Sequence, residues 1–391
     1  MNEHCYYKVA GLAFEVVLPA GWDADALLPS FADFRLEPVH GDPSRALRMT
    51  NFSRHSEAKP KDLPEESFCS IRFFADAQND ETAQNDETAQ NDSVIRPQQR
   101  LAESVYLQQQ SSTIEGTVIS ANTASSGAER SAGAGEASLG AEPPKKKAQP
   151  KNLPAEPPKI LSETFVDAGH LTLKQQGDSY IIDLEYDSLT KITHTMVCDS
   201  NFRSVIGYVN PQDKYLPMVI TSFLRIAFAQ AALAHECISI HASCVVLEQK
   251  AYLFLGKSGT GKSTHARQWM SAFPGCTLLN DDNPAIRIEE GKIFAYGTPW
   301  SGKTPCYKNE RYPVAGIVRL SQAKANKFTL LSGTEAFAAL LPSCSSIRQD
   351  ARLQELLIGT LIEITETVPV GKMECLPDTD AAKVCYKGLQ I

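Results

Sequence analysis

Features typical of secreted, zinc-binding and nucleic-acid-binding proteins are missing from this sequence of 391 residues. None of its ten cysteines belongs to a C-x-x-C pair or to a cysteine and histidine cluster with zinc spacing, which predicts reduced thiols in a cytoplasmic protein. No basic segment followed by an apolar one stands at the start, so secretion is not expected. The formal charge of −8 comes without a basic face or tail, and we therefore expect no nucleic-acid partner.

A membrane-spanning segment is also not expected. The longest apolar run, residues 218–234, is interrupted by Arg225 and Gln230, whereas a membrane span needs about 20 predominantly apolar residues. Apolar residues between 214 and 234 recur at spacings of three and four, which predicts a buried amphipathic helix.

The composition changes twice along the chain and predicts three parts. Short alternating segments over 1–55 and 160–210 predict a small β-rich N-terminal domain. Residues 56–159 contain a repeated Ala-Gln-Asn-Asp-Glu-Thr unit and a segment rich in Ser, Ala, Gly, Glu, Pro and Lys, which predicts a low-complexity, disordered insertion. The remainder, 211–391, alternates strand and helix patterns and is typical of an α/β domain.

Individual elements follow from the same patterns. In the β-rich part we expect strands within 6–19 and over 31–38, 163–173, 179–186 and 192–197. In the α/β part we expect strands over 238–247, 251–255, 276–282, 285–288, 293–296, 314–320 and 368–376. Helices are expected over 264–272, 335–341, 345–362 and 378–389, the last capped by Asp378.

The most specific motif follows the apolar strand over 251–255. Its residues are Gly256, Lys257, Ser258, Gly259, Thr260, Gly261, Lys262, Ser263 and Thr264, with the spacing G-x-x-x-x-G-K-[ST] of a phosphate-binding loop between a strand and a helix. Glycine takes up backbone angles closed to other residues, so successive amides can turn toward an anion. We expect Lys262 to reach the β and γ phosphates of ATP and the Ser263 hydroxyl to bind Mg²⁺.

Two carboxylates end the strand over 276–282. A carboxylate near such a loop can hold Mg²⁺, and a neighbouring one can accept the proton of an attacking hydroxyl. We therefore expect Asp281 to bind Mg²⁺, directly or through water, beside Asp282. His241 lies inside the apolar strand over 238–247, and this pattern alone favours a core histidine.

Three segments in this order resemble the catalytic domain of HPr kinase/phosphorylase, which shares a P-loop superfamily with phosphoenolpyruvate carboxykinase. They are Ile240-His241-Ala242-Ser243, the loop from Gly256 to Ser263, and Leu279-Asn280-Asp281-Asp282. The resemblance covers residues 235–320 and implies an α/β nucleotide-binding domain with a mixed sheet. It implies an active site of His241, Lys262 and Asp282, with Ser263 on Mg²⁺ and Asp282 as the base toward the acceptor hydroxyl.

The sequence departs from that family at two places. Thr264 stands where the family has an acidic residue, and the segment Gly297-Thr298-Pro299-Trp300-Ser301-Gly302-Lys303 replaces a Glu-x-Arg-Gly-x-Gly segment and resembles uncharacterised relatives of the group. The acceptor and a second metal ligand are therefore unassigned. Glu310 is a candidate ligand, Lys303 and Arg311 are candidate phosphate or acceptor clamps, and Trp300 could stack on a base, each against a surface or packing role.

These patterns together predict a kinase that transfers the γ-phosphoryl group of ATP to a hydroxyl acceptor, with Mg²⁺. The acceptor is a small molecule, a peptide or a protein serine. One alternative is an ATP-binding accessory or regulatory module with slow hydrolysis, which the missing acidic ligand favours. A carboxykinase acting on phosphoenolpyruvate is a further alternative, although that family is longer and uses ligands not found here. Whether the chain forms a homo-oligomer is left open.

Overall fold

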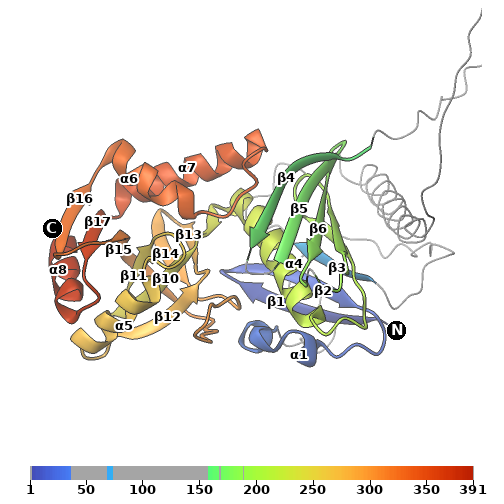
Figure 1. Cartoon of the computed structure of the whole chain (residues 1–391), viewed down its shortest axis with the longest axis horizontal. Helices are drawn as coiled ribbons and strands as arrows, with labels where there is room; N and C mark the ends of the chain where they lie inside the picture. The colour runs from blue at the N-terminus through green and yellow to red at the C-terminus, as the bar shows by residue number, and fades with distance from the viewer. Residues whose placement is uncertain (1, 37–67, 74–156, 167–168, 188, 391) are drawn as a thin grey trace, which may run out of the picture.

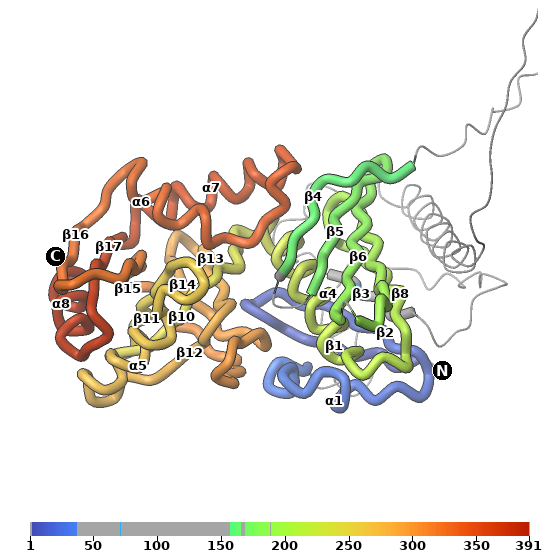
Figure 2. Tube along the Cα trace, in the orientation of Figure 1, coloured from blue at the N-terminus to red at the C-terminus, as the bar shows by residue number. Residues whose placement is uncertain are grey.

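The computed structural model describes residues 2–36, 68–73, 157–166, 169–187 and 189–390. The repeat and most of the insertion predicted over 56–159 lie outside these residues. Two β-sheets, with helices around them, form the two halves of the molecule in Figure 1, and the chain passes between the halves near α4. The tube in Figure 2 places the C-terminus at the far end from the N-terminal strands.

The N-terminal sheet has eight antiparallel strands in the order β1-β2-β3-β8-β7-β6-β5-β4. The predicted β-rich character of this region is confirmed. The strands are β1 (Glu3–Val9), β2 (Leu12–Leu18), β3 (Phe68–Phe73), β4 (Lys159–Val166), β5 (Gly169–Gln176), β6 (Ser179–Glu185), β7 (His194–Cys198) and β8 (Ser204–Tyr208).

Three local predictions in this region were wrong. β3 lies inside the range predicted to lack order, and it joins β2 to β8 with Ile71 in the core. The strand predicted over 31–38 is instead a 3₁₀ helix, η1 (Pro29–Phe34), because Phe31 and Phe34 are three residues apart and both turn inward in that helix. The strand predicted over 163–173 is divided between β4 and β5.

The predicted apolar helix is present as α4 (Leu216–Ala231), which continues into the 3₁₀ turn η3 (Ala232–His235). By length and composition the stretch Leu216–His235 could cross a membrane, but 67% of its most apolar window is buried inside the molecule. α4 packs against β3, β7 and β8 and leads directly into the second sheet. It therefore serves as the connecting core helix between the two sheets.

The second sheet is mixed and has nine strands, with the path β12-β10-β11-β15-β14-β13-β9 and with β16 and β17 added beside β15. β15 runs parallel to β11 and β17, and the other pairs are antiparallel. The strands are β9 (Cys237–Ser239), β10 (Ala242–Leu247), β11 (Lys250–Leu255), β12 (Thr277–Asp282), β13 (Ala285–Glu289), β14 (Lys292–Tyr296), β15 (Arg311–Gln322), β16 (Lys327–Leu331) and β17 (Val370–Cys375).

Helices cover both faces of this sheet. α5 (Lys262–Ala272) and α8 (Thr379–Leu389) lie together on one face, while α6 (Gly333–Leu340) and α7 (Ala351–Thr367) lie on the other (Figure 1). Asp378 caps α8 as predicted, with its carboxylate accepting from the Ala381 amide at 2.8 Å. α7 begins later than predicted, because the Asp350 carboxylate accepts from the Leu353 amide at 2.9 Å and caps the helix there.

Side chains of β11 alternate between these two faces. Tyr252 and Phe254 pack toward α5 and α8, whereas Leu253 and Leu255 pack into the larger core shared with α6, α7 and the N-terminal sheet. All four side chains are buried, which is why this strand appears in the sequence as a continuous apolar run. We name the two sides the α5 face and the α7 face.

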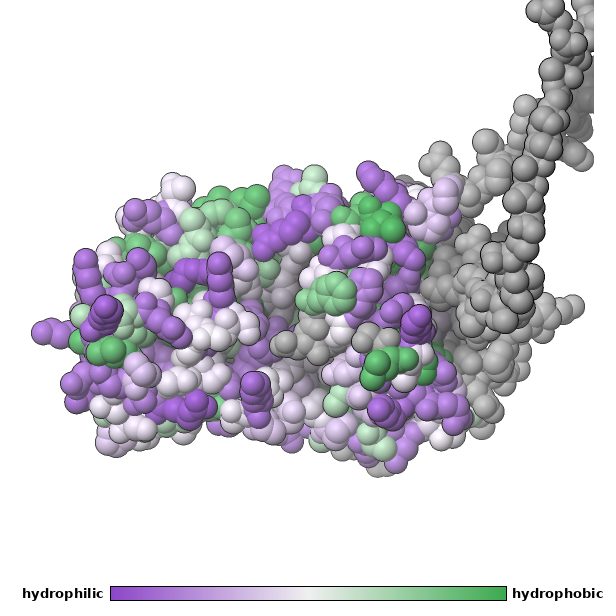
Figure 3. Space-filling view, viewed as in Figure 1, coloured by the Kyte–Doolittle hydropathy of each residue, from purple (hydrophilic) through white to green (hydrophobic). Residues whose placement is uncertain are grey.

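The two sheets also share packing outside α4. Phe31 of η1 contacts Trp300 with ring centroids 5.7 Å apart, and Arg287 of β13 donates to the Ala10 carbonyl at 3.2 Å in the turn between β1 and β2. On the face shown in Figure 3, exposed apolar side chains form small groups between hydrophilic ones. One group lies where α6 and α7 run in Figure 1, and Ile358 and Ile362 of α7 are exposed.

The buried His265 of α5 makes stability depend on pH. Burial lowers the pKa of His265 to about 4, from 6.5, and its Nε2 accepts from the Trp269 indole at 3.1 Å. Between pH 6.5 and about 4 the unfolded chain binds a proton on this imidazole that the folded chain does not bind. The free energy of unfolding should therefore fall as pH falls through this window, by on the order of 3 kcal/mol.

This prediction is measured by urea denaturation at pH 7, 5.5 and 4.5 on the wild type and on His265→Gln, whose amide can still accept from the indole. The variant should lose less stability than the wild type between pH 7 and pH 4.5. Equal losses in both proteins would mean that other groups cause the pH dependence.

Candidate active site

The glycine-rich loop lies between β11 and α5, at the end of the parallel pair β11 and β15. Gly259 and Gly261 have φ of 79° and 107°, in the left-handed region that favours glycine. No side chain caps α5 at Gly261, so the first amides of the helix have no side-chain acceptor. The loop therefore presents N–H groups and the positive end of a helix dipole on the same side as Lys262.

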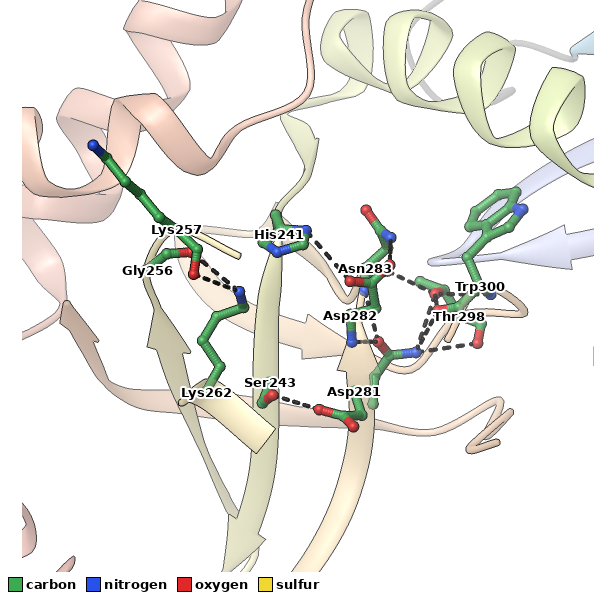
Figure 4. A network of polar contacts seen from close by, with 11 residues as sticks. His241, Ser243, Gly256, Lys257, Lys262, Asp281, Asp282, Asn283, Thr298 and Trp300 are labelled. Carbon is green, nitrogen blue, oxygen red and sulfur yellow. Dashed lines mark hydrogen bonds and ion pairs between the residues drawn. The ribbon is translucent and has the colours of Figure 1, made fainter. Parts of the chain in front are cut away.

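Lys262 is the first residue of α5, and its side chain is buried. Its ammonium donates to the carbonyls of Gly256 at 3.1 Å and Lys257 at 3.4 Å (Figure 4). Burial lowers the pKa of Lys262, Asp282 and Asp281 oppose this shift, and Arg319 adds to it. The Lys262 ammonium thus donates hydrogen bonds only to neutral carbonyls. The two carboxylates make no hydrogen bond to it, but their charges raise its pKa.

The other loop side chains are less enclosed. Lys257 is exposed and points away from Lys262 and His241 in Figure 4, although its carbonyl supports Lys262. Ser263 and Thr264 are half-buried in the first turn of α5. Within the described residues the Ser263 hydroxyl has no hydrogen-bond partner, so its oxygen remains available to a ligand.

His241 lies between β9 and β10, not inside one continuous strand as the sequence predicted. The Ser343 carbonyl accepts from its amide at 2.8 Å, and Ile240 forms a bridge with Cys344. The imidazole Nδ1 is 3.3 Å from Oδ1 of Asp282, and both side chains are partly exposed. The break between β9 and β10 thus places the imidazole at the ends of the strands, partly exposed and beside the Asp282 carboxylate.

Asp281 and Asp282 point to opposite sides of β12. Asp281 pairs in register with Ser243 and accepts from its hydroxyl at 2.5 Å, with both side chains buried. Ser243 in turn pairs with Phe254, so Asp281 lies on the α5 face. Asp282 pairs with Ala242 and therefore lies on the α7 face with His241.

A β-bulge sets this orientation. The register between β10 and β12 pairs Val245 with Leu278 but Cys244 with Asn280, so Leu279 is an extra residue. An uninterrupted strand would turn Asp281 to the α7 face and Asp282 to the α5 face, because the side-chain period is two.

The fully buried Asn280 side chain holds the strand end after the bulge. Its Oδ1 accepts from the amides of Asp282 and Asn283, at 3.1 and 3.0 Å. Its Nδ2 donates to the carbonyls of Thr298 and Trp300, at 3.3 and 3.0 Å. This amide thereby ties the loop over 297–305 to the carboxylate pair.

Trp300 packs in the core and does not face the glycine-rich loop (Figure 4). Its ring lies 5.7 Å from Phe31 and 5.1 Å from Phe228, and its indole N–H donates to the Thr221 carbonyl at 3.2 Å. The packing role therefore fits Trp300 better than a stacking role. The adjacent Gly302 amide donates to the Asp281 carbonyl at 2.7 Å.

The remaining charged candidates lie outside the cluster formed by Lys262, His241 and the two aspartates. Arg311 forms an ion pair with Glu289, and its guanidinium lies 4.7 Å from the Phe294 ring centroid. Glu310 accepts from the Tyr312 hydroxyl at 3.1 Å. Lys303 is exposed on the loop that follows Trp300. Partners on β13, β14 and β15 therefore account for Arg311 and Glu310.

The structure thus gathers Lys262, His241, Asp281 and Asp282 at the ends of β10, β12 and α5. Sequence reasoning missed Ser243 and Asn280, which hold the two carboxylates in place. A polar residue inside an apolar strand was the one available signal for Ser243. Within the described part of the chain, no group of three or more His, Cys, Asp or Glu could hold a metal ion.

Comparisons with known proteins give a distant likeness. No family model and no curated protein matches this chain. Among solved structures, the Hpr(Ser) kinase/phosphatase from Coxiella burnetii aligns with 39% of this chain and 93% of that chain, at a TM-score of 0.24 and 12% sequence identity. Both values are too low to assign a family.

Removing the Asn280 amide should destabilise the fold. Asn280→Ala leaves four backbone partners, three of them in buried bonds, without their hydrogen bonds, and we expect a loss of about 2–3 kcal/mol in the free energy of unfolding. Asn309→Ala is the matched control, since this exposed amide makes a single bond to the Asp33 carbonyl and should cost less than about 0.5 kcal/mol. Urea denaturation of both variants measures the difference, and similar losses would disprove a central role for Asn280.

Proposed function

We propose that this protein is an ATP-dependent kinase that transfers the γ-phosphoryl group to a hydroxyl acceptor. The observation that carries the proposal is the convergence of a buried lysine in a glycine-rich loop, Lys262, with two differently held carboxylates, Asp281 and Asp282. Phosphoryl transfer needs positioning and charge stabilisation more than covalent chemistry by the protein. These residues can supply both.

Triphosphate binding is supported by the state of the loop. Lys262 is desolvated and donates only to carbonyl oxygens, so phosphate oxygens would replace neutral acceptors with charged ones. The uncapped amides at the start of α5 offer further donors. The anion would thus offset the cost of burying the ammonium in the folded protein.

Mg²⁺ fits the available oxygens, since it is usually held by one or two carboxylates together with substrate phosphates. Ser263 and Asp281 would hold it, because both lie on the α5 side of the sheet and the Ser263 oxygen has no partner among the described residues. The ion would supply positive charge against the phosphates.

Asp282 is the proposed base. Its carboxylate is partly exposed, and Asn283 Nδ2 donates to one of its oxygens while His241 lies beside the other. The acceptor oxygen would attack phosphorus as its proton passes to this carboxylate, and the bond from phosphorus to the ADP oxygen would break. His241 would hold the carboxylate in orientation.

A second function is favoured by one observation. The described residues contain no cluster of three or more metal-binding side chains. Any metal would therefore depend on the phosphates, Ser263 and Asp281, and so sparse a site suits an ATP-binding regulatory module with slow hydrolysis. Consumption of ATP only when an acceptor is present supports the kinase, and slow acceptor-independent consumption supports the module.

Lys262→Ala should weaken Mg²⁺-ATP binding about 10- to 100-fold, because hydrogen bonds to charged groups contribute about 1.5–3 kcal/mol. Lys257→Ala is the matched control and should change the affinity much less, since that side chain is exposed and points away from Lys262. Isothermal titration with ATP measures both. Unchanged affinity in Lys262→Ala would remove the basis for a phosphate site here.

Asp282→Asn should retain ATP affinity but lose transfer by about 10²- to 10⁴-fold, the usual contribution of a general base. The measurement is the incorporation of label from γ-labelled ATP into acceptors of a cell extract. Asn283→Ala, which removes one donor to the same carboxylate, should cause a smaller loss. Full transfer by Asp282→Asn would exclude Asp282 as the base.

A further inference from the structure

Arg319 of β15 lies beside the start of the glycine-rich loop. It pairs in the parallel register with Leu255, the residue before Gly256. Its neighbours Val318 and Leu320 pack on the α5 face, so the Arg319 side chain leaves the sheet on the α7 face. Asp282 and His241 lie on that same face.

The guanidinium of Arg319 binds the last turn of α6 and the 3₁₀ turn that follows it. Nη1 donates to the Ala339 carbonyl at 2.6 Å and to the Ser343 hydroxyl at 3.4 Å. The same Ser343 accepts from the His241 amide through its carbonyl, at 2.8 Å. A continuous path of contacts therefore runs from Arg319 through Ser343 to His241, and from there to Asp282.

Arg319 has no carboxylate partner among the residues that the structure describes. Its charge instead acts on Lys262, whose pKa it helps to lower. Arg319 is half-buried and donates to one backbone carbonyl and one hydroxyl. These two hydrogen bonds hold a part of the chain that also contacts His241.

We propose that Arg319 is a positioning residue that fixes the segment Ala339 to Ser343 against β15 and thereby holds His241 beside Asp282. The catalytic consequence rests on the proposed kinase function, whereas the effect on His241 does not.

The kinetic test is Arg319→Met measured alone and in a His241→Ala background. Arg319→Met should lower the rate of phosphoryl transfer about 10- to 100-fold, as displaced catalytic groups do, with a change of less than about threefold in KM for ATP. In the His241→Ala background it should cause little further loss, because both changes act through one group. The proposal would be overturned if Arg319→Met changed only KM for ATP. It would also be overturned if the effects of Arg319→Met and His241→Ala on the rate were fully additive.

Arg348→Met is the matched control. Arg348 donates to the carbonyl of Leu341 in the same segment and to that of Cys344 just after it, but from an exposed position. It should leave transfer nearly unchanged. A loss equal to that of Arg319→Met would mean that any contact to the segment matters equally, which contradicts a specific role for Arg319.

An NMR measurement needs no activity and separates this proposal from the proposed function. In histidine-labelled protein, the ring signal of His241, identified by its loss in His241→Ala, should shift in Arg319→Met and remain in place in Arg348→Met. If the wild type transfers no phosphate, the kinase proposal fails while this shift still tests Arg319. An unshifted His241 signal in Arg319→Met overturns the proposal.

Folding is monitored by thermal denaturation of each variant. If Arg319→Met does not fold, Arg319→Lys carries the same measurements, since it keeps the charge but cannot reproduce both bonds of the guanidinium. In Arg319→Lys the His241 signal should shift from its wild-type position, and the rate of transfer should fall by less than the 10- to 100-fold expected for Arg319→Met. A wild-type His241 signal together with a wild-type rate in Arg319→Lys would then overturn the proposal.

Discussion

The extra residue in β12 is the constraint on which the arrangement of this site depends. Because Leu279 interrupts the two-residue period, Asp281 faces α5 and Asp282 faces His241. The buried amide of Asn280 holds the chain in this register through the backbone of its neighbours. Two adjacent aspartates thereby acquire different surroundings, one buried against a serine hydroxyl and one partly exposed beside an imidazole.

Each face of the second sheet contributes a different part of the proposed chemistry. The α5 face carries the helix start, Lys262 and Asp281, which suit phosphate and metal. The α7 face carries His241, Asp282 and Arg319, which suit the acceptor and its proton. The glycine-rich loop stands at the strand ends where the two faces meet. Asp282 and Asp281 both oppose the lowering of the Lys262 pKa, although their side chains point apart.

The sequence was sufficient for the parts that depend on local pattern. The loop, the strand before it, the apolar helix α4 and the Asp378 cap follow from periodicity and from residues with strong local preferences. It was not sufficient where one residue changes the phase of a strand. No local preference marks Leu279 as a bulge, and His241 was assigned to a continuous strand because its apolar neighbours hide the break. The turn at Phe31 and Phe34 failed similarly, since a spacing of three fits a short 3₁₀ helix as well as an irregular strand.

The contact of Trp300 with Phe31 and Phe228 has a practical consequence for dissecting the protein. The indole belongs to the loop tied to Asn280, whereas its two aromatic neighbours belong to the N-terminal segment and to α4. A fragment that begins after the N-terminal strands would expose this ring to water and loosen the loop beside the carboxylates. An excised second sheet would therefore lack part of the packing that supports the loop beside the two carboxylates.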